Sequence, residues 1–234
     1  MNTLRQVSLD ELRTNHPEEG IKNLFRVRSA NQCLLDAKNR PNPKMLFSEF
    51  WHEGELCILF ADTNVGKSIL AVQIANSISQ GIPIKGFYLD SPSQPVIYFD
   101  FELSDKQFEK RYSKDYRDHF TFDENLYRIE IDPEKLTQFD FENQLFSSLE
   151  ETIETLNSKV IIIDNLTYLK AQATETAKEA LPLMKRLKDL KTKFNLSILV
   201  LAHTPKRNPS NPITKNDLAG SKHLANFADS IFAI

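Results

Sequence analysis

The sequence contains few cysteines and no long apolar run, and each shortage excludes a class of protein. Cys33 and Cys57 are too few for a disulfide framework or a cysteine-rich zinc site. The longest apolar run, residues 56–61, is far shorter than the roughly 20 residues of a membrane-spanning helix. The first residues lack the apolar region of a signal peptide. We therefore expect a cytoplasmic protein that does not contact a membrane.

Glycine is also scarce, with 6 among 234 residues, and no G-x-G-x-x-G can be written, which excludes the dinucleotide-binding fingerprint. The net charge of −3 excludes a uniformly basic nucleic-acid-binding surface. Charge is unevenly spread, however. Residues 121–157 hold ten acidic and two basic residues, whereas residues 203–223 hold four basic and one acidic residue. A phosphate-backbone partner would avoid the acidic segment and could tolerate the basic one, and a solvated helix face alone would explain the acidic residues.

The first 44 residues are expected to form a short helical extension and linker. Ser8 and Glu11 have the spacing of a capping box that opens a short helix. A second helix is predicted over residues 29–39, and the Arg-Pro-Asn-Pro of residues 40–43 is typical of a linker. Residues 45–234 are then the main domain.

From residue 45 onward, apolar strands alternate with helices. Strands are predicted at 56–60, 95–99, 126–131, 160–163, 197–202 and 230–234. Helices are predicted at 67–80, 104–118 and 218–228. Apolar residues at helical spacing predict two more helices, over 145–156 and 180–190. Pro182 is expected in the first turn of the second of these. Fully apolar strands separated by helices predict an α/β fold with three layers and a mainly parallel sheet. In such sheets ligands bind at the carboxyl ends of the strands.

A phosphate-binding loop directly follows the first of these long strands. It matches G-x-x-x-x-G-K-[ST] except that alanine stands at its first position. Backbone amides at a helix N-terminus attract an anion, the lysine would reach the β- and γ-phosphates, and the serine would supply a hydroxyl to Mg²⁺. We expect these residues to bind ATP: Ala61, Asp62, Thr63, Asn64, Val65, Gly66, Lys67, Ser68 and Ile69.

Polar residues end three further strands. Asp164 follows four apolar residues, the Walker B pattern, and would hold Mg²⁺ through water. Asp100 and Glu102 share one face at a strand end, where Glu102 would polarise the attacking water and Asp100 would assist it. Glu102 could instead cap the next helix together with Ser104. His203 would contact the γ-phosphate, or it could be structural.

The segment after His203 is a further candidate for function. Residues 204–216 contain three prolines and three basic residues without apolar periodicity, which predicts a loop. Lys206, Arg207 and Lys215 could contact nucleic-acid phosphates. A solvated surface loop explains the same composition.

Together these motifs resemble the RecA-like ATPase core, and in particular hexameric replicative helicases of the DnaB type and the plasmid RepA type. Residues 47–56 resemble the lead-in to their first strand, and residues 218–230 resemble their Gly-Ser segment. The resemblance covers about residues 45–234. It implies a three-layer α/β/α P-loop fold, ATP and Mg²⁺, a homo-hexamer, and single-stranded DNA as partner. It also implies that Glu102, Lys67, Asp164 and His203 are catalytic and that Ser68 and Asp164 hold the metal.

The expected function is therefore ATP hydrolysis in DNA replication or mobilisation, by a helicase-like ATPase. Two alternatives stay open. The first is a non-motor switch, in which ATP controls oligomerisation or partner binding. The second is a small-molecule kinase, which is disfavoured because no arginine-rich lid is evident and Glu102 suits water activation better.

Overall fold

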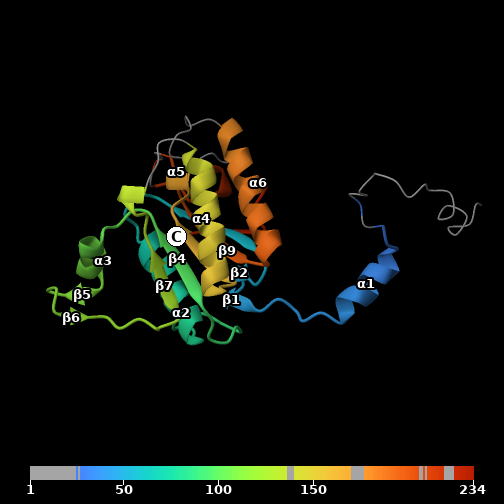
Figure 1. Cartoon of the computed structure of the whole chain (residues 1–234), viewed down its shortest axis with the longest axis horizontal. Helices are drawn as coiled ribbons and strands as arrows, with labels where there is room; N and C mark the ends of the chain where they lie inside the picture. The colour runs from blue at the N-terminus through green and yellow to red at the C-terminus, as the bar shows by residue number, and fades with distance from the viewer. Residues whose placement is uncertain are drawn as a thin grey trace, which may run out of the picture. The chain divides into compact units, whose positions relative to one another are not determined.

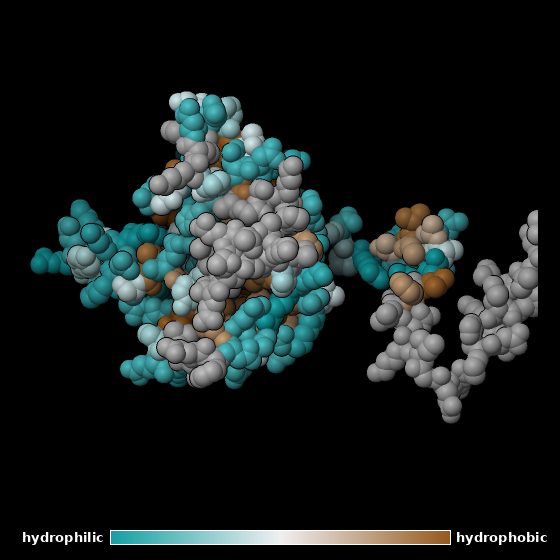
Figure 2. Space-filling model, turned by 90° about the horizontal axis from the view of Figure 1, so that it is seen from above, coloured by the Kyte–Doolittle hydropathy of each residue, from teal (hydrophilic) through white to brown (hydrophobic). Residues whose placement is uncertain are grey.

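The computed structural model describes residues 25, 27–135, 140–169, 177–205, 208, 210–218 and 224–234. The chain divides into two compact units, Met1–Asn42 and Pro43–Ile234. The first contains α1 (Ala30–Lys38), which begins where the Ser29 hydroxyl accepts the Gln32 amide, as predicted. Leu34 and Leu35 of α1 are exposed, and hydrophobic residues show on the surface of this segment in Figure 2. The helix predicted at Ser8 lies outside the described residues.

Six strands form the central sheet of the second unit, in the order β10-β3-β9-β8-β4-β7. Every neighbouring pair is parallel, which confirms the predicted sheet. The strands are β3 (Leu56–Ala61), β4 (Val96–Asp100), β7 (Leu126–Ile129), β8 (Val160–Asp164), β9 (Ser197–His203) and β10 (Ser230–Ala233).

Helices cover both faces of this sheet, so the fold has the three layers that the sequence predicts. On one face lie α4 (Phe141–Leu156) and α6 (Ala177–Phe194), which run side by side in Figure 1. On the other lies α2 (Lys67–Gln80). Successive side chains of β8 point to opposite faces of the sheet and so contribute to the apolar core on each face. Ile161 packs toward α4 and α6, whereas Ile162 packs toward α2. Full burial of such side chains stabilises the fold by about 1.5–3 kcal/mol each.

Shorter elements complete the unit. They are β1 (Met45–Phe47), β2 (Trp51–His52), α3 (Asp105–Arg111), β5 (Ser113–Lys114), β6 (Asp118–His119), η1 (Pro133–Lys135), α5 (Leu166–Leu169) and η2 (Lys215–Asp217). Within the described ranges, no helix is long and apolar enough to cross a bilayer.

The predicted helix 104–118 is wrong at its carboxyl end. Helix α3 stops at Arg111, and the chain turns back as the β5–β6 hairpin, with the Phe120 amide donating to the Tyr112 carbonyl at 2.8 Å. Packing of Phe108, Tyr112 and Phe122 against one another favours this reversal over a longer helix. The predicted strand 126–131 likewise ends early, at Ile129.

One helix prediction in the carboxyl half also differs from the structure. Pro182 lies inside α6, five residues after its start at Ala177, and not in the first turn. Its side chain is exposed, so the helix continues although proline removes one backbone donor. Of the predicted helix 218–228, residues 219–223 lie outside the described residues, and Leu224 is buried.

Candidate active site

The carboxyl ends of β3, β4, β8 and β9 meet at one edge of the sheet. In the register of the ladders Asp100 is opposite Asp164, and Ala61 is opposite His203. Parallel strands carry the chain out of the sheet on the same side, so residues that follow different strands come together there. The sequence-predicted groups Glu102, Asp164 and His203 therefore lie beside the phosphate loop.

The phosphate loop joins β3 to α2, and its conformation explains the alanine at its first position. Ala61 is the last residue of β3, in extended backbone, so this position does not require glycine. The left-handed conformations fall instead at Asn64, with φ 66°, and at Gly66, with φ 103°. A Cβ placed on Gly66 would meet no atom within 4 Å, so this backbone faces open space. Helix α2 begins directly after it, with its N-terminal amides beside that space.

Lys67 is buried against its own loop. Its Nζ donates to the carbonyl oxygens of Ala61 at 3.1 Å and Asp62 at 2.9 Å. Burial lowers the pKa of this ammonium, and the negative charges of Asp164 and Glu102 partly oppose that effect. A buried ammonium bonded to neutral carbonyls is able to accept a stronger, anionic partner.

Asp164 at the end of β8 and Ser68 at the start of α2 form a pair of oxygen-bearing side chains. Burial is the main cause that raises the pKa of Asp164, and hydrogen bonds from Ser68 and Tyr98 oppose it. The Tyr98 hydroxyl donates to Asp164 Oδ2 at 2.5 Å. The described residues hold no cluster of three or more His, Cys, Asp or Glu side chains that could bind a metal alone. A hydroxyl and a carboxylate fit Mg²⁺, which keeps several waters and takes further oxygens from phosphate.

Glu102 belongs to a three-residue polar cluster. The Asn165 amide donates to Glu102 Oε1 and also lies 3.1 Å from His203 Nε2. His203 Nε2 is 3.5 Å from Glu102 Oε1, and His203 Nδ1 is buried without a hydrogen-bond partner among the described residues. Ser104, and not Glu102, caps α3, in a capping box with Gln107. The alternative helix-cap role for Glu102 is therefore not what this geometry supports.

Asn165 was not identified from the sequence. It directly follows the Walker B carboxylate, and its position at the end of β8 was the signal that could have found it. It is buried, so its amide stays between Glu102 and His203. The side chains in contact come from β4, β8 and β9, which only the sheet order brings together.

Asp100 holds the turn that carries Glu102. Its Oδ1 accepts the backbone amides of Glu102 at 3.1 Å and Leu103 at 3.0 Å. Its Oδ2 accepts Arg128 Nε at 2.9 Å, and Arg128 also pairs with Asp105 at 2.7 Å. Asp100 is buried, and this pairing compensates its charge. Asp100 thus contacts the backbone of Glu102, and its assistance to catalysis stays a prediction.

A cleft of about 440 Å³ opens over these groups, within the usual range of ligand pockets of about 300–1,000 Å³. Arg111, from the last turn of α3, also lines it and was missed because the predicted helix continued past this residue. The lining residues are Thr63, Asn64, Gly66, Lys67, Ser68, Ile69, Glu102, Arg111 and His203.

The loop after β9 is tied to the phosphate loop. The Thr204 amide donates to the Ala61 carbonyl at 3.1 Å, and the Thr204 hydroxyl donates to Asp62 Oδ1. Lys206 and Arg207, two of the predicted nucleic-acid contacts, lie outside the described residues. The third, Lys215, is exposed in η2 and does not line the cleft. Among the described residues, the candidate nucleic-acid contact Lys215 is therefore separate from the cleft.

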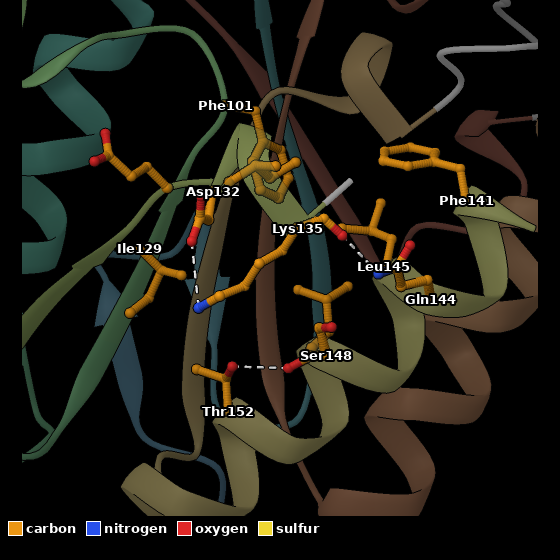
Figure 3. A pocket seen from close by; sticks show the side chains of 12 residues that line it. Phe101, Ile129, Asp132, Lys135, Phe141, Gln144, Leu145, Ser148 and Thr152 are labelled. Carbon is orange, nitrogen blue, oxygen red and sulfur yellow. Dashed lines mark hydrogen bonds and ion pairs between the residues drawn. The ribbon is translucent and has the colours of Figure 1, made fainter. Parts of the chain in front are cut away.

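A second pocket, of about 210 Å³, lies between β7 and α4. Figure 3 shows Lys135 extending across it to pair with Asp132, at 3.2 Å. Apolar side chains such as Leu145 and Leu149 form much of its wall. The first turn of α4 contributes Phe141 and Gln144 to its wall, but the phosphate-binding loop and the predicted catalytic residues Lys67, Glu102 and His203 line the other cleft, at the sheet edge.

Comparison with known proteins agrees with this architecture. A family model described as an AAA domain matches residues 25–209. Among solved structures, a KaiC-like protein from the hyperthermophilic archaeon Pyrococcus horikoshii OT3 is similar in fold, with a TM-score of 0.52 at 12% identity. The match covers 78% of this chain and 72% of that one. No curated protein matches. The predicted RecA-like three-layer fold is confirmed, whereas a specific relationship to DnaB-type or RepA-type helicases stays a prediction.

Proposed function

The chain belongs to the AAA domain family, and from this premise we propose that it binds Mg·ATP in the cleft at the sheet edge and hydrolyses it. One observation carries the proposal. The Gly66-Lys67-Ser68 turn and the Glu102–His203 pair line one cleft, and the Asp164 carboxyl group is buried next to Ser68, so groups from the ends of four strands meet at one edge of the sheet.

The first part of the proposed site binds and neutralises phosphate. The amides of the loop and of the start of α2 would donate to phosphate oxygens, at the space that Gly66 leaves open. Lys67 would exchange its two backbone carbonyl partners for phosphate oxygens, which are stronger acceptors. Ser68 and Asp164 would hold Mg²⁺, whose charge, when it is bound, stabilises the negative charge of the transferring group.

The second part activates water. Glu102 would orient a water molecule for attack on the γ-phosphate and accept its proton, a role that typically contributes about 10²–10⁴ to the rate. His203, 3.5 Å from Glu102, would contact the γ-phosphate from the end of β9. Asn165 links the two side chains, so a change at His203 would reach Glu102 through it.

The experiment that tests ATP hydrolysis compares the wild type with Glu102→Gln and Lys67→Ala. We expect Glu102→Gln to lower kcat about 10²- to 10⁴-fold while ATP still binds. Lys67→Ala should weaken ATP binding. Glu109→Gln is the matched control, because Glu109 pairs with Lys106 and His119 outside the cleft. Normal hydrolysis by Glu102→Gln would rule out the assigned base, and full ATP affinity in Lys67→Ala would rule out the phosphate site.

For the role of this activity, we propose a homo-oligomeric, helicase-like ATPase that acts on single-stranded DNA in replication or mobilisation. The support is the resemblance of the motifs to hexameric helicases, together with the exposed Lys215 in the segment that follows β9. The test is the ATPase rate with and without single-stranded DNA across a salt series. Stimulation that weakens steeply as salt rises supports the role, because phosphate contacts release counterions.

A non-motor switch is the second candidate, and one observation favours it. The described part of the first unit exposes large apolar side chains, Phe25, Val27, Leu34 and Leu35, which is typical of a segment that binds a partner. Assembly that depends on ATP and on protein concentration, without any effect of DNA on the ATPase rate, would support this candidate over the helicase-like role.

A further inference from the structure

We propose that Tyr98 is a positioning residue for metal-dependent nucleotide binding, because its hydroxyl holds the Asp164 carboxyl group in the orientation that faces Ser68. The inference rests on the proposed function, since it concerns the same Mg·ATP site. It adds a residue that no motif identifies and that does not line the cleft.

The sheet geometry brings the two side chains together. In the β4–β8 ladder Tyr98 is opposite Ile162, and Asp164 is two residues further along β8. Positions two apart on a strand lie on the same face, so Tyr98 and Asp164 both face the α2 layer. The Tyr98 hydroxyl reaches Asp164 Oδ2 at 2.5 Å, and both side chains are buried. Ser68, at the start of α2, lowers the pKa of the same carboxyl group, which opposes the effect of burial.

The hydroxyl of Tyr98 is a polar group among buried apolar residues of β4. Val96, Ile97 and Phe99 around it are apolar and buried, and a phenylalanine ring would serve the packing of Tyr98 equally well. A buried hydroxyl is unfavourable unless it is hydrogen-bonded, and here Asp164 is the acceptor. The bond therefore explains why a hydroxyl is present at this position.

When Tyr98 holds one carboxylate oxygen of Asp164, the orientation of the other oxygen is fixed as well. The terminal torsion of aspartate is broad, so an unrestrained carboxyl group would turn toward any nearby donor. Two donors of the proposed site influence it: Ser68, which lowers its pKa, and Lys67, whose charge interacts with it. Both are groups that the proposed site needs for the metal and the phosphates. With Oδ2 held by Tyr98, the carboxyl group keeps one orientation, and outer hydrogen bonds of this kind typically change metal affinity about 10- to 100-fold.

The test measures nucleotide binding rather than turnover. The Kd of a fluorescent ADP analogue is determined with Mg²⁺ and with EDTA for the wild type, Tyr98→Phe, Asp164→Asn and the double variant. The quantity compared is the ratio of the two Kd values. Tyr127→Phe is the matched control, because it removes a tyrosine hydroxyl from the neighbouring strand β7 without contact to Asp164. Fluorescence of Trp51, the single tryptophan, checks that each variant is folded.

We expect Tyr98→Phe to change the ratio of the Kd values with Mg²⁺ and with EDTA on the order of tenfold, most of the way to the ratio of Asp164→Asn. The Kd in EDTA alone should stay within about twofold of the wild type. The double variant should equal Asp164→Asn, because Tyr98 acts through Asp164. Additive effects, an unchanged ratio, or equal weakening with and without Mg²⁺ would overturn the inference. Failure of the wild type to bind nucleotide would instead refute the proposed function.

Discussion

Replacing Gly66 by alanine separates the phosphate-binding role of the loop from its contribution to stability. Gly66 has φ 103° and ψ 14°, a conformation that residues with a Cβ rarely adopt. The added methyl group would meet no protein atom within 4 Å. The free protein should therefore lose only the backbone strain energy, about 1–3 kcal/mol of its free energy of unfolding.

The effect on nucleotide binding should be larger than this strain. The methyl group would project into the space beside the start of α2 that the phosphates are proposed to occupy. Loss of even one hydrogen bond between an amide and a charged phosphate costs about 1.5–3 kcal/mol. Since 1.4 kcal/mol corresponds to a tenfold change, ATP should bind about 10- to 150-fold more weakly.

Gly54→Ala is the matched control. Gly54 also has a positive φ, 76°, and an added Cβ there also meets nothing within 4 Å, but Gly54 does not line the cleft. Urea unfolding is followed by the fluorescence of Trp51, which is fully buried and should shift to the red on exposure. ATP affinity is measured by calorimetry on the same samples.

The two alanine variants should lose similar stability, and only Gly66→Ala should lose ATP affinity. The reasoning is refuted if Gly66→Ala binds ATP as tightly as the wild type. It is refuted equally if Gly54→Ala, at equal folded fraction, weakens ATP binding by the same factor, because strain alone would then explain both results.

Three further outcomes follow from particular contacts. Arg128→Met should lower the free energy of unfolding by about 3 kcal/mol in urea titrations, because it leaves the buried Asp100 carboxylate without its charged partner; an unchanged midpoint would contradict this pairing. Burial raises the pKa of the Cys57 thiol to about 12, so at pH 8–9 a thiol reagent should label only exposed Cys33 in the native protein and both residues in denaturant. Leu149→Ala should cost about 2–5 kcal/mol, measured in the same unfolding assay, because this side chain of α4 is almost fully buried against the sheet; a loss below 1 kcal/mol would show that the core refills the space.

Local patterns in the sequence predicted the fold well wherever neighbouring residues decide the structure. Helix α2 has the predicted bounds of 67 and 80, because left-handed glycines at positions 66 and 81 bracket it. The prediction failed at residues 112–118. There the choice between continued helix and hairpin depends on where the aromatic rings pack, which periodicity along the chain does not record.

In the candidate site, too, the features set by neighbouring residues were predicted and those set by tertiary packing were not. The phosphate loop and the carboxylates and histidine after the strands could be identified from the sequence, since each needs only a strand end and a residue type. The contact between Asn165 and Glu102 could not be predicted, because the two residues are 63 positions apart and meet only through the sheet order. Arg111 was likewise missed, because its place at the cleft depends on where α3 ends.

The sequence by itself determined that helices and strands form an α/β fold, the order of these elements along the chain, and the residues of the phosphate-binding loop. Each of these depends on residues that are close in sequence. The tertiary structure alone decided which strands are neighbours, and therefore which side chains share the cleft. It also placed the Tyr98 hydroxyl on Asp164 and Arg128 on Asp100. These contacts join distant segments, and they form only when the buried faces of the sheet and its helices pack together.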